Sequence, residues 1–374
     1  MPKNLTITLR VCKKIIFISA ACFTLFPFNS SALNSNLKPG IDYVPGELIV
    51  KMRAARGSSR AGAMRAIGAR PNMSVRNEIP GAGLFVVKSD QSKLAEDIAR
   101  LSSSADIESV SLNYLYYPAT TDTYYSSEWH LPKISAPTGW LYTTGLAAVR
   151  IAVIDNGFQL DHPDLVNRFS SVYKYNAATK GADGINAACD HGTQVSGVLG
   201  AQANNTIGMA GLALGNEMVP IQVRADSGCT MTSERIIQGI YYSTDSARGI
   251  KVINMSLGGS NYDQNLQDAV DEAWVKGLVV VAAAGNSIIK AYPAAMEHVV
   301  AVAATDTLDR RSAFSSYGPW VDLAAPGESM VVTMAGGSYG SAAGTSFSAP
   351  LVSGLAGLIW SKTGNSGLTN AQVI

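Results

Sequence analysis

The chain has 374 residues, of which 47% are hydrophobic and 15% are charged, and its formal net charge is +1. This length and composition are typical of a globular protein with one large domain and a smaller one. A net charge near zero, without any block of like charges, argues against nucleic acid as a partner.

Residues 1–32 have the layout of an export signal. A basic stretch over 3–14 precedes the apolar run IIFISAACFTLFPF at 15–28, and Ser30-Ser31-Ala32 offers a small-residue cleavage site. Cys22 inside the run is a candidate for lipidation, but the run continues past it. The run is too short for a comfortable membrane span, and no later stretch is long enough for one. We therefore predict a secreted protein, extracellular or periplasmic, without a membrane span after signal removal.

Two cysteines, Cys189 and Cys229, remain once the signal is removed. In an oxidising compartment, two cysteines most simply form one disulfide. Closing a loop of this length would stabilise the fold by roughly 3–4 kcal/mol in the chain-entropy model. Two buried free thiols are the alternative, whereas a metal pair lacks enough nearby ligands.

The segment after the signal alternates between strand-like and helix-like patterns. The order strand, helix, strand, helix, strand predicts a small α+β domain of ferredoxin-like type. The predicted elements lie at 45–52, 61–69, 83–88, 91–101 and 107–117. An exposed linker is expected at 116–123.

From about residue 120 onward, long apolar runs occur without alternation. Such strands are buried on both faces, as in a parallel sheet. Helical patterns lie between them, the clearest at 265–276 with Gly277 as its stop. Alternating strands and helices predict a three-layer α/β domain with a mostly parallel sheet. The apolar runs are at 149–154, 218–223, 251–255, 278–284 and 299–303.

Polar residues follow several of these runs at their carboxyl ends, where ligands bind in such folds. Asp155 ends the first run, and Asn286 follows the fourth. His191 and Ser346 stand at the predicted starts of two apolar helices.

An imidazole can take the proton of a serine hydroxyl, a buried carboxylate can orient the imidazole, and an amide can donate to an oxyanion. These four side chains supply every part that acyl transfer requires. Ser346 is preferred over Ser348 as nucleophile, because the glycine two residues before it permits a tight approach.

The order of these residues along the chain separates the known classes of serine hydrolase. Asp155, His191 and Ser346 run Asp–His–Ser, as in subtilisin, whereas trypsin-like proteases run His–Asp–Ser. The α/β-hydrolases run Ser–Asp–His with a GxSxG motif, which does not frame Ser346, so an esterase is disfavoured. A secreted protein that keeps the scaffold for binding without catalysis is the alternative from another class.

Five motifs occur in order: AVIDNGFQLDHPDL (152–165), DHGTQVSGVLG (190–200), NMSLGG (254–259), AAAGNS (282–287) and GTSFSAP (344–350). On these motifs, residues 120–374 resemble the subtilase family of serine endopeptidases. The resemblance implies the subtilisin-type α/β fold and hydrolysis of peptide bonds through an acyl-enzyme. It assigns Asp155, His191 and Ser346 to a catalytic triad. It also assigns Asn286 as the oxyanion donor.

The region before residue 120 is similar to the inhibitory propeptide of that family. The resemblance implies that 33–119 helps the peptidase domain to fold and blocks its cleft until self-cleavage, between Tyr117 and Thr121. The predicted organisation is a signal at 1–32, a propeptide at 33–119 and a peptidase domain at 120–374. Residues 369–374 have the pattern of a helix that ends after about one turn, which is consistent with a domain continuing past Ile374.

The resemblance also implies where a peptide substrate binds. Ser256, Leu257 and Gly258 would form one wall and an edge strand, and Ala283 to Gly285 the floor of the primary side-chain pocket. Ser227 and Gly228 would pair with the substrate on its other side. Backbone pairing between two strand edges favours broad specificity for protein and peptide substrates. We expect a monomer whose own propeptide is an intramolecular inhibitor.

A calcium site of the thermitase type is implied as well. Its side-chain ligands would be Asp122, Asp164 and Asn205. Its carbonyl ligands would be Gln202, Ile207 and Met209. This all-oxygen set suits Ca²⁺. A solvated loop with two unrelated aspartates is the alternative.

Two positions depart from the family pattern. Asn156 follows the aspartate where Ser or Thr is usual, and we expect it to tune the site through local hydrogen bonds. Gln194 replaces a common second histidine, which leaves His191 as the sole candidate in its motif.

Overall fold

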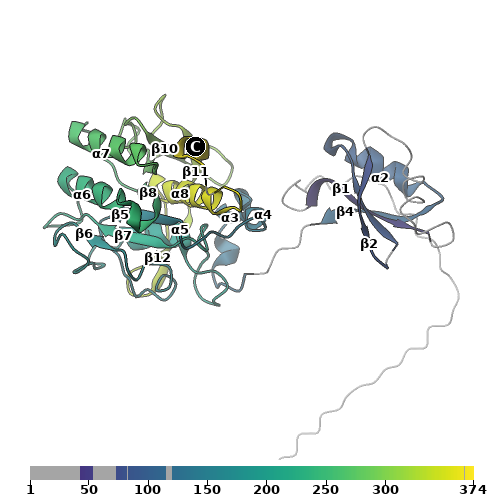
Figure 1. Cartoon of the computed structure of the whole chain (residues 1–374), viewed down its shortest axis with the longest axis horizontal. Coiled ribbons are helices and arrows are strands. Elements are labelled where there is room, and N and C mark those ends of the chain that lie inside the picture. The colour runs from purple at the N-terminus through teal and green to yellow at the C-terminus, as the bar shows by residue number, and fades with distance from the viewer. Residues whose placement is uncertain (1–42, 54–72, 82, 115–119, 366) are drawn as a thin grey trace, which may run out of the picture. The chain divides into compact units, whose positions relative to one another are not determined.

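The computed structural model describes residues 43–53, 73–81, 83–114, 120–365 and 367–374. The described residues form two compact units, one centred on Gly46–Leu112 and a larger one on Asn113–Ile374 (Figure 1). The predicted signal at 1–32 and the predicted helix at 61–69 lie outside the described residues.

The smaller unit is a four-stranded sheet with one α-helix among its described residues. The strands lie in the order β2-β3-β1-β4, and β3 pairs antiparallel with both β1 and β2. Its core contains Leu48, Phe85 and Leu94, all buried. Sequence analysis missed β2, an edge strand in which only Val75 is buried, because a polar edge strand lacks an apolar pattern. The elements are β1 (Tyr43–Met52), β2 (Ser74–Ile79), β3 (Leu84–Lys88), η2 (Gln91–Lys93), α2 (Leu94–Ser102) and β4 (Ile107–Tyr114).

The larger unit is built on a seven-stranded sheet in which every pairing is parallel. The strand order is β11-β10-β9-β8-β5-β7-β6. All five predicted strands are present, and the two short edge strands, β6 and β11, were not predicted. The strands are β5 (Arg150–Asp155), β6 (Tyr175–Asn176), β7 (Met218–Gln222), β8 (Ile250–Met255), β9 (Val279–Ala283), β10 (Val299–Thr305) and β11 (Leu323–Pro326).

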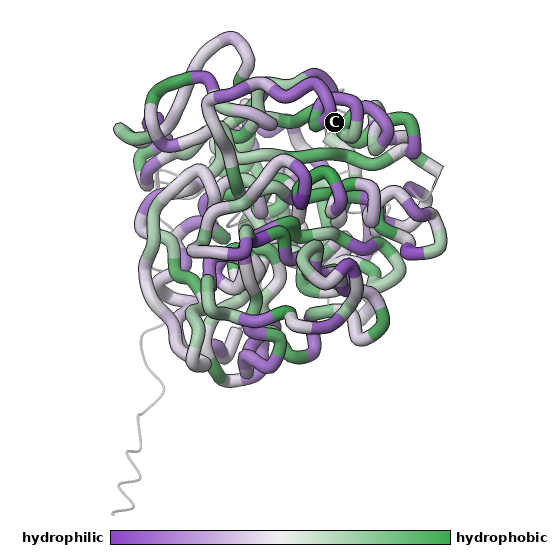
Figure 2. The backbone as a smooth tube through the Cα atoms, turned by 90° about the vertical axis from the view of Figure 1, so that its left-hand side faces the viewer, coloured by the Kyte–Doolittle hydropathy of each residue, from purple (hydrophilic) through white to green (hydrophobic). Residues whose placement is uncertain are grey.

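Helices cover both faces of this sheet, as the prediction of three layers requires. Alternate residues of β5 enter two separate apolar clusters: Ile151 and Val153 pack with α5 (His191–Gly200) and α8 (Thr345–Ser361). Ala152 and Ile154 pack on the other face with α6 (Ser233–Ser243) and α7 (Gln264–Val275). Burial on both faces explains the unbroken apolar runs, and Figure 2 shows hydrophobic stretches through the interior of this unit.

Helix ends follow local sequence signals. Asp263 accepts a hydrogen bond from Asn265 N–H at the start of α7, and Gly277 with φ of 82° follows its end, as predicted. The hairpin of β12 (Met330–Met334) and β13 (Ser338–Ala342) is tied to α5 by Thr333, whose hydroxyl donates to Thr193 O at 2.7 Å. The remaining elements are η3 (Tyr125–Ser127), α3 (His130–Lys133), α4 (Ala136–Gly139), η4 (Ser246–Arg248) and α9 (Asn370–Val373). In the described parts of the chain, no helix combines the length and apolar character needed to cross a membrane.

Candidate active site

The four predicted catalytic residues stand where strands end or helices begin. Asp155 is the last residue of β5, and Asn286 follows β9 by three residues. His191 is the first residue of α5, and Ser346 the second residue of α8. Because β5 and β9 belong to the same parallel sheet, their carboxyl ends lie at one edge. His191, Asn286 and Ser346 all line one cleft of about 510 Å³ there.

Asp155 and His191 form a hydrogen-bonded pair. The Nδ1 atom of His191 lies 2.9 Å from Oδ1 of Asp155 and 3.0 Å from Oδ2. The carboxylate side chain is fully buried, while 29% of the imidazole is exposed. Such a carboxylate keeps the Nδ1–H tautomer and leaves Nε2 as the basic nitrogen.

The electrostatics of the pair favour a basic imidazole. Burial opposes the charged form of His191, but the charge of Asp155 and its hydrogen bond outweigh burial, and Asp190 adds to them. Together these groups raise the pKa of His191 above its ordinary value. The imidazole is therefore a stronger proton acceptor than a free histidine.

Ser346 lies beside the pair without a hydrogen bond to it. Its hydroxyl donates to the Ser256 carbonyl at 3.3 Å, and the Ser256 hydroxyl donates to the Ser346 carbonyl at 2.7 Å. Within the described residues, no bond joins the Ser346 hydroxyl to His191. Catalytic hydrogen bonds are often loose without substrate, so a rotation of the Ser346 side chain would be needed to complete the arrangement.

Asn286 is held so that its amide nitrogen is available. The backbone N–H and the hydroxyl of Thr345 both donate to Asn286 Oδ1, each at 2.9 Å. The Gly285 N–H donates to the Thr345 hydroxyl at 3.1 Å. Among the described residues, Nδ2 of Asn286 has no partner, and it lies 3.2 Å from the place that a Cβ on Gly344 would take. Glycine at 344 therefore leaves room beside this donor.

The cleft brings some of the predicted substrate contacts next to His191 and Ser346. Ser256, Leu257, Gly258, Ala283 and Gly285 all line it. Ser227 and Gly228 are exposed and do not line it, so their pairing with substrate remains a prediction.

Sequence analysis missed other residues that line the site. Met231 and Lys290 both line the cleft, and Lys290 carries its only permanent charge. An adjoining pocket of about 400 Å³ shares Met231 and Leu257 and extends to Leu266 and Tyr292. Met231, Lys290, Leu266 and Tyr292 lie outside the recognised motifs, so no motif identified them.

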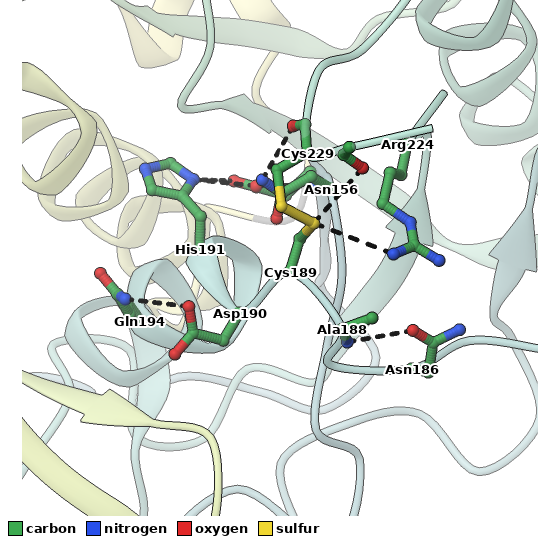
Figure 3. Close-up of a disulfide and its surroundings, with 11 residues drawn as sticks. Asn156, Asn186, Ala188, Cys189, Asp190, His191, Gln194, Arg224 and Cys229 are labelled. Atoms are coloured by element: carbon green, nitrogen blue, oxygen red, sulfur yellow. Dashed lines mark hydrogen bonds and ion pairs between the residues drawn. A yellow bond between two sulfur atoms is a disulfide. The ribbon is translucent and has the colours of Figure 1, made fainter. Parts of the chain in front are cut away.

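The predicted disulfide joins Cys189 to Cys229 (Figure 3). Cys189 lies two residues before His191 in the chain. Nδ2 of Asn156 donates to the Cys229 carbonyl at 3.2 Å, and the Asn156 N–H donates to Asp155 Oδ1 at 2.7 Å. Asn156 is therefore a neighbour of both the disulfide and the Asp155 carboxylate.

The predicted calcium ligands are residues of the loop 202–209 and the carboxylates of Asp122 and Asp164, which accept hydrogen bonds from that loop. Asp122 accepts hydrogen bonds from the backbone N–H groups of Asn204 and Asn205, at 2.8 and 3.0 Å. Asp164 accepts from the N–H of Met209 at 2.9 Å and from the side-chain amide of Asn205 at 2.7 Å. Because the Asn205 amide nitrogen points at Asp164, its side chain must turn before its oxygen can bind a cation.

The charges in this cluster fit a cation. Burial raises the pKa of Asp164, the charge of Asp122 adds to it, and no Lys or Arg in the described residues offsets it. Burial also raises the pKa of Glu128 to about 9, with Asp122 and Asp164 adding to the effect. The described residues contain no metal-binding group of three or more His, Cys, Asp or Glu side chains. The predicted set has two carboxylates and relies otherwise on amide and carbonyl oxygens, which calcium accepts.

Comparison with known proteins agrees with the fold. The family model described as "Subtilase family" matches residues 147–373, and the model "Fervidolysin N-terminal prodomain" matches residues 30–113. The chain therefore belongs to the subtilase family. It is a subtilisin-like serine protease with an N-terminal prodomain.

Individual relatives extend this assignment along the chain. The thermophilic serine proteinase of Bacillus sp. (strain AK1) is 34% identical, over 95% of this chain and 91% of its own length. Thermitase of Thermoactinomyces vulgaris is 40% identical, over 64% of this chain and 85% of its own. A solved protease structure from Pseudoalteromonas arctica superimposes with a TM-score of 0.61 at 28% identity, covering 68% of this chain and 90% of that one.

Proposed function

We propose that this protein is an exported endopeptidase that hydrolyses peptide bonds with Ser346 as nucleophile, His191 as general base and Asp155 as the carboxylate that orients it. The observation that carries the proposal is the hydrogen bond between Asp155 and His191, 2.9 Å long. His191 lines the same cleft as Ser346. Chain order supports it, because Asp–His–Ser is the order of subtilisin.

In the acylation step, Nε2 of His191 takes the proton of the Ser346 hydroxyl as Oγ attacks the substrate carbonyl carbon. Asp155 holds the Nδ1–H and stabilises the imidazolium that forms. The imidazolium then protonates the leaving amine, and an acyl-enzyme remains on Ser346. His191 next deprotonates a water molecule, which attacks the ester, and the imidazolium returns the proton to Ser346 Oγ as the second product leaves.

The negative charge that develops on the substrate oxygen needs donors that are already in place. Nδ2 of Asn286 and the backbone N–H of Ser346 are proposed to supply them. Thr345 orients the Asn286 amide, since both of its hydrogen bonds end on the amide oxygen. The peptide itself would lie along Ser256 to Gly258, with its primary side chain toward Ala283 and Gly285. Ser227 and Gly228 would pair with it from the other side.

The precursor is proposed to mature by self-cleavage. In this proposal residues 1–32 direct export, residues 33–119 act as the intramolecular inhibitor, and the mature peptidase begins near residue 120. The matches of the prodomain model to residues 30–113 and of the subtilase model to residues 147–373 support this division. The mature enzyme would be a secreted monomer acting on proteins or peptides.

Calcium is proposed as a structural ion at Asp122, Asp164, Gln202, Asn205, Ile207 and Met209. Bound there, it would neutralise two buried carboxylates and join residues near the mature start to the loop 202–209. It would take no part in the proton transfers at Ser346.

Intact mass spectrometry of the secreted protein tests the proposal. Wild type and Ser346→Ala are each purified and incubated with calcium. We expect wild type to lose a segment that ends between Tyr117 and Thr121, while Ser346→Ala keeps it. If both stay whole and wild type cleaves no peptide, the protein is a binding protein on this scaffold. If both are cut alike, another protease is responsible.

A further inference from the structure

The disulfide closes a ring of bonds that passes through the catalytic pair. It joins Cys189 to Cys229, and the Cys229 carbonyl accepts from Nδ2 of Asn156 at 3.2 Å (Figure 3). The Asn156 N–H donates to Asp155 at 2.7 Å, and Asp155 holds His191 at 2.9 Å. His191 leads back along the backbone to Cys189, two residues earlier.

The start of α5 is held to the β12–β13 hairpin, because the Ala335 N–H donates to Asp190 Oδ2 at 3.3 Å, and the ring joins it to the loop 226–230. The α5 helix begins without a side-chain cap, because Asp190 makes no capping hydrogen bond. Residues 226–230 are exposed throughout. The backbone ties of that loop run within it, from Ala225 N–H to Thr230 O at 2.8 Å and across the Arg224–Met231 bridge. Arg235 ties this loop to α6 by donating to Asp226 Oδ1 at 2.5 Å, and the disulfide and Asn156 tie it to α5 and β5.

We propose that the Cys189–Cys229 disulfide and Asn156 are positioning residues for the Asp155–His191 pair, so that reduction of the disulfide lowers peptide hydrolysis while the domain stays folded. This inference rests on the proposed function. The disulfide joins two loop segments, whereas the seven-stranded sheet and its two apolar clusters contain the bulk of the packing. Reduction would therefore loosen the start of α5 and leave the core intact.

The environments of the two sulfur atoms predict the course of reduction. Cys229 is exposed and Cys189 is buried, so a small external thiolate reaches Cys229 Sγ first. Its attack forms a mixed disulfide with Cys229, breaks the S–S bond and releases Cys189 as a thiolate. Nη1 of Arg224 lies 3.8 Å from Cys189 Sγ, where its positive charge stabilises the leaving thiolate. A second thiolate then attacks the reagent sulfur of this mixed disulfide. It releases the Cys229 thiol and forms a disulfide between the two reagent molecules.

Reduction also places new charge beside the base. The Cys189 thiolate would add negative charge two residues from His191, while the loss of the tie through Cys229 would loosen Asn156 and Asp155. Both effects act on the protonation of His191. A bond that served stability alone would change the unfolding temperature and leave the pH profile of hydrolysis in place.

The test compares mature wild type with and without dithiothreitol, in calcium buffer well below the unfolding midpoint. We expect reduction to lower kcat about tenfold with a smaller change in KM, since small misplacements of catalytic groups are costly. We expect an unchanged near-ultraviolet circular dichroism spectrum and recovery on reoxidation. The matched control is the double variant Cys189→Ser/Cys229→Ser. It should have the low activity and should not respond to dithiothreitol.

A double-mutant cycle tests the role of Asn156. Asn156→Ala should lower kcat in the oxidised protein and add little in the double-serine background, because both changes break the same ring. Asn156→Asp, which keeps the size but lacks the amide donor, should behave like Asn156→Ala. Additive effects would overturn the positioning role, as would an unchanged kcat after complete reduction or a loss of activity that only accompanies unfolding.

A second readout separates this inference from the proposed function. The imidazole of His191 is titrated by NMR in the oxidised and reduced protein, with His191→Ala to assign its signal. A changed titration supports the positioning role, and an unchanged titration overturns it, whether or not the protein cleaves peptides. If oxidised wild type hydrolyses nothing, the proposed function fails on its own.

Discussion

Thr345 holds Asn286 by two hydrogen bonds, from its backbone N–H and from its hydroxyl, and both end on the amide oxygen of Asn286 at 2.9 Å. The amide nitrogen is thereby turned away from Thr345. Gly344, immediately before Thr345, has no side chain to fill the space beside that nitrogen. One short segment at the start of α8 thus carries the proposed nucleophile and orients the proposed oxyanion donor.

Loss of the oxyanion donor should lower kcat and leave KM nearly unchanged, because the bond forms only as charge develops. For Asn286→Ala we expect a loss of roughly a hundred- to a thousand-fold, the range known for the relative subtilisin. Thr345→Val keeps the backbone bond and the side-chain shape but removes the hydroxyl, and we expect about a tenfold loss. Steady-state kinetics on a peptide anilide measure both. A kcat of Thr345→Val equal to that of wild type would show that the hydroxyl does not orient Asn286.

The pH dependence should follow the neutral form of His191. Because Asp155 and Asp190 raise its pKa, kcat/KM should rise with pH and reach half its plateau above the ordinary value of about 6.5. Asp190→Asn removes one of these charges and should move the half-point to lower pH. The matched control is Asp268→Asn, the same change on the exposed side of α7 across the sheet. A half-point that moves equally in both variants would contradict the local effect of Asp190.

The same pair makes folding stability depend on pH in the opposite sense. A group whose pKa is raised by folding stabilises the protein fully below its unfolded pKa and loses that contribution as pH rises through the folded value. The stabilisation by Asp155 and His191 is therefore greatest below about pH 6.5. Urea unfolding of wild type and His191→Ala across this range measures the difference, which should shrink as pH increases.

Chelation should destabilise the peptidase domain if the proposed calcium site is filled. Calcium at a thousand times its Kd would contribute about 4 kcal/mol, which in a domain of this size shifts the unfolding temperature by about 8–16 °C. Asp164→Asn should lose most of this response to EDTA, and the exposed Asp268→Asn should keep it. A wild type with the same unfolding temperature in EDTA and in calcium would contradict the site.

The charge of Lys290 should influence which side chains the cleft accepts, since it is the only permanent charge among the lining residues. We expect a glutamate before the cleaved bond to be preferred to a lysine by about fivefold, as for charges that meet near solvent. Lys290→Met should remove this preference and Lys290→Glu should reverse it. Paired peptide anilides that differ only in that residue provide kcat/KM values, and an unchanged ratio in Lys290→Glu would refute the assignment.

The sequence predicted the layers of the peptidase domain because strands buried on both faces, such as 279–283, need unbroken apolar runs. The edge strands β2, β6 and β11 lacked that signal, since short or polar edges need no apolar periodicity. The proposed triad could be predicted because Asp155 ends a strand and His191 and Ser346 stand at helix starts, each within a motif.

Other features depend on distances that no sequence pattern encodes. Counting cysteines predicted the bond between Cys189 and Cys229, but not that Asn156 would join it to Asp155. The rotamer of Ser346, whose hydroxyl bonds to Ser256, follows from packing around that one side chain. Lys290 lines the cleft as part of the segment after Asn286, where no motif marks it.

Covalent labelling tests whether His191 and Asp155 activate Ser346. Mature wild type is treated with a fluorophosphonate, digested with an unrelated protease and mapped by mass spectrometry, beside His191→Ala matured by added protease. We expect one phosphonyl group on Ser346 in wild type and very little in His191→Ala. Labelling at another serine, or equal labelling of Ser346 in both proteins, would contradict it.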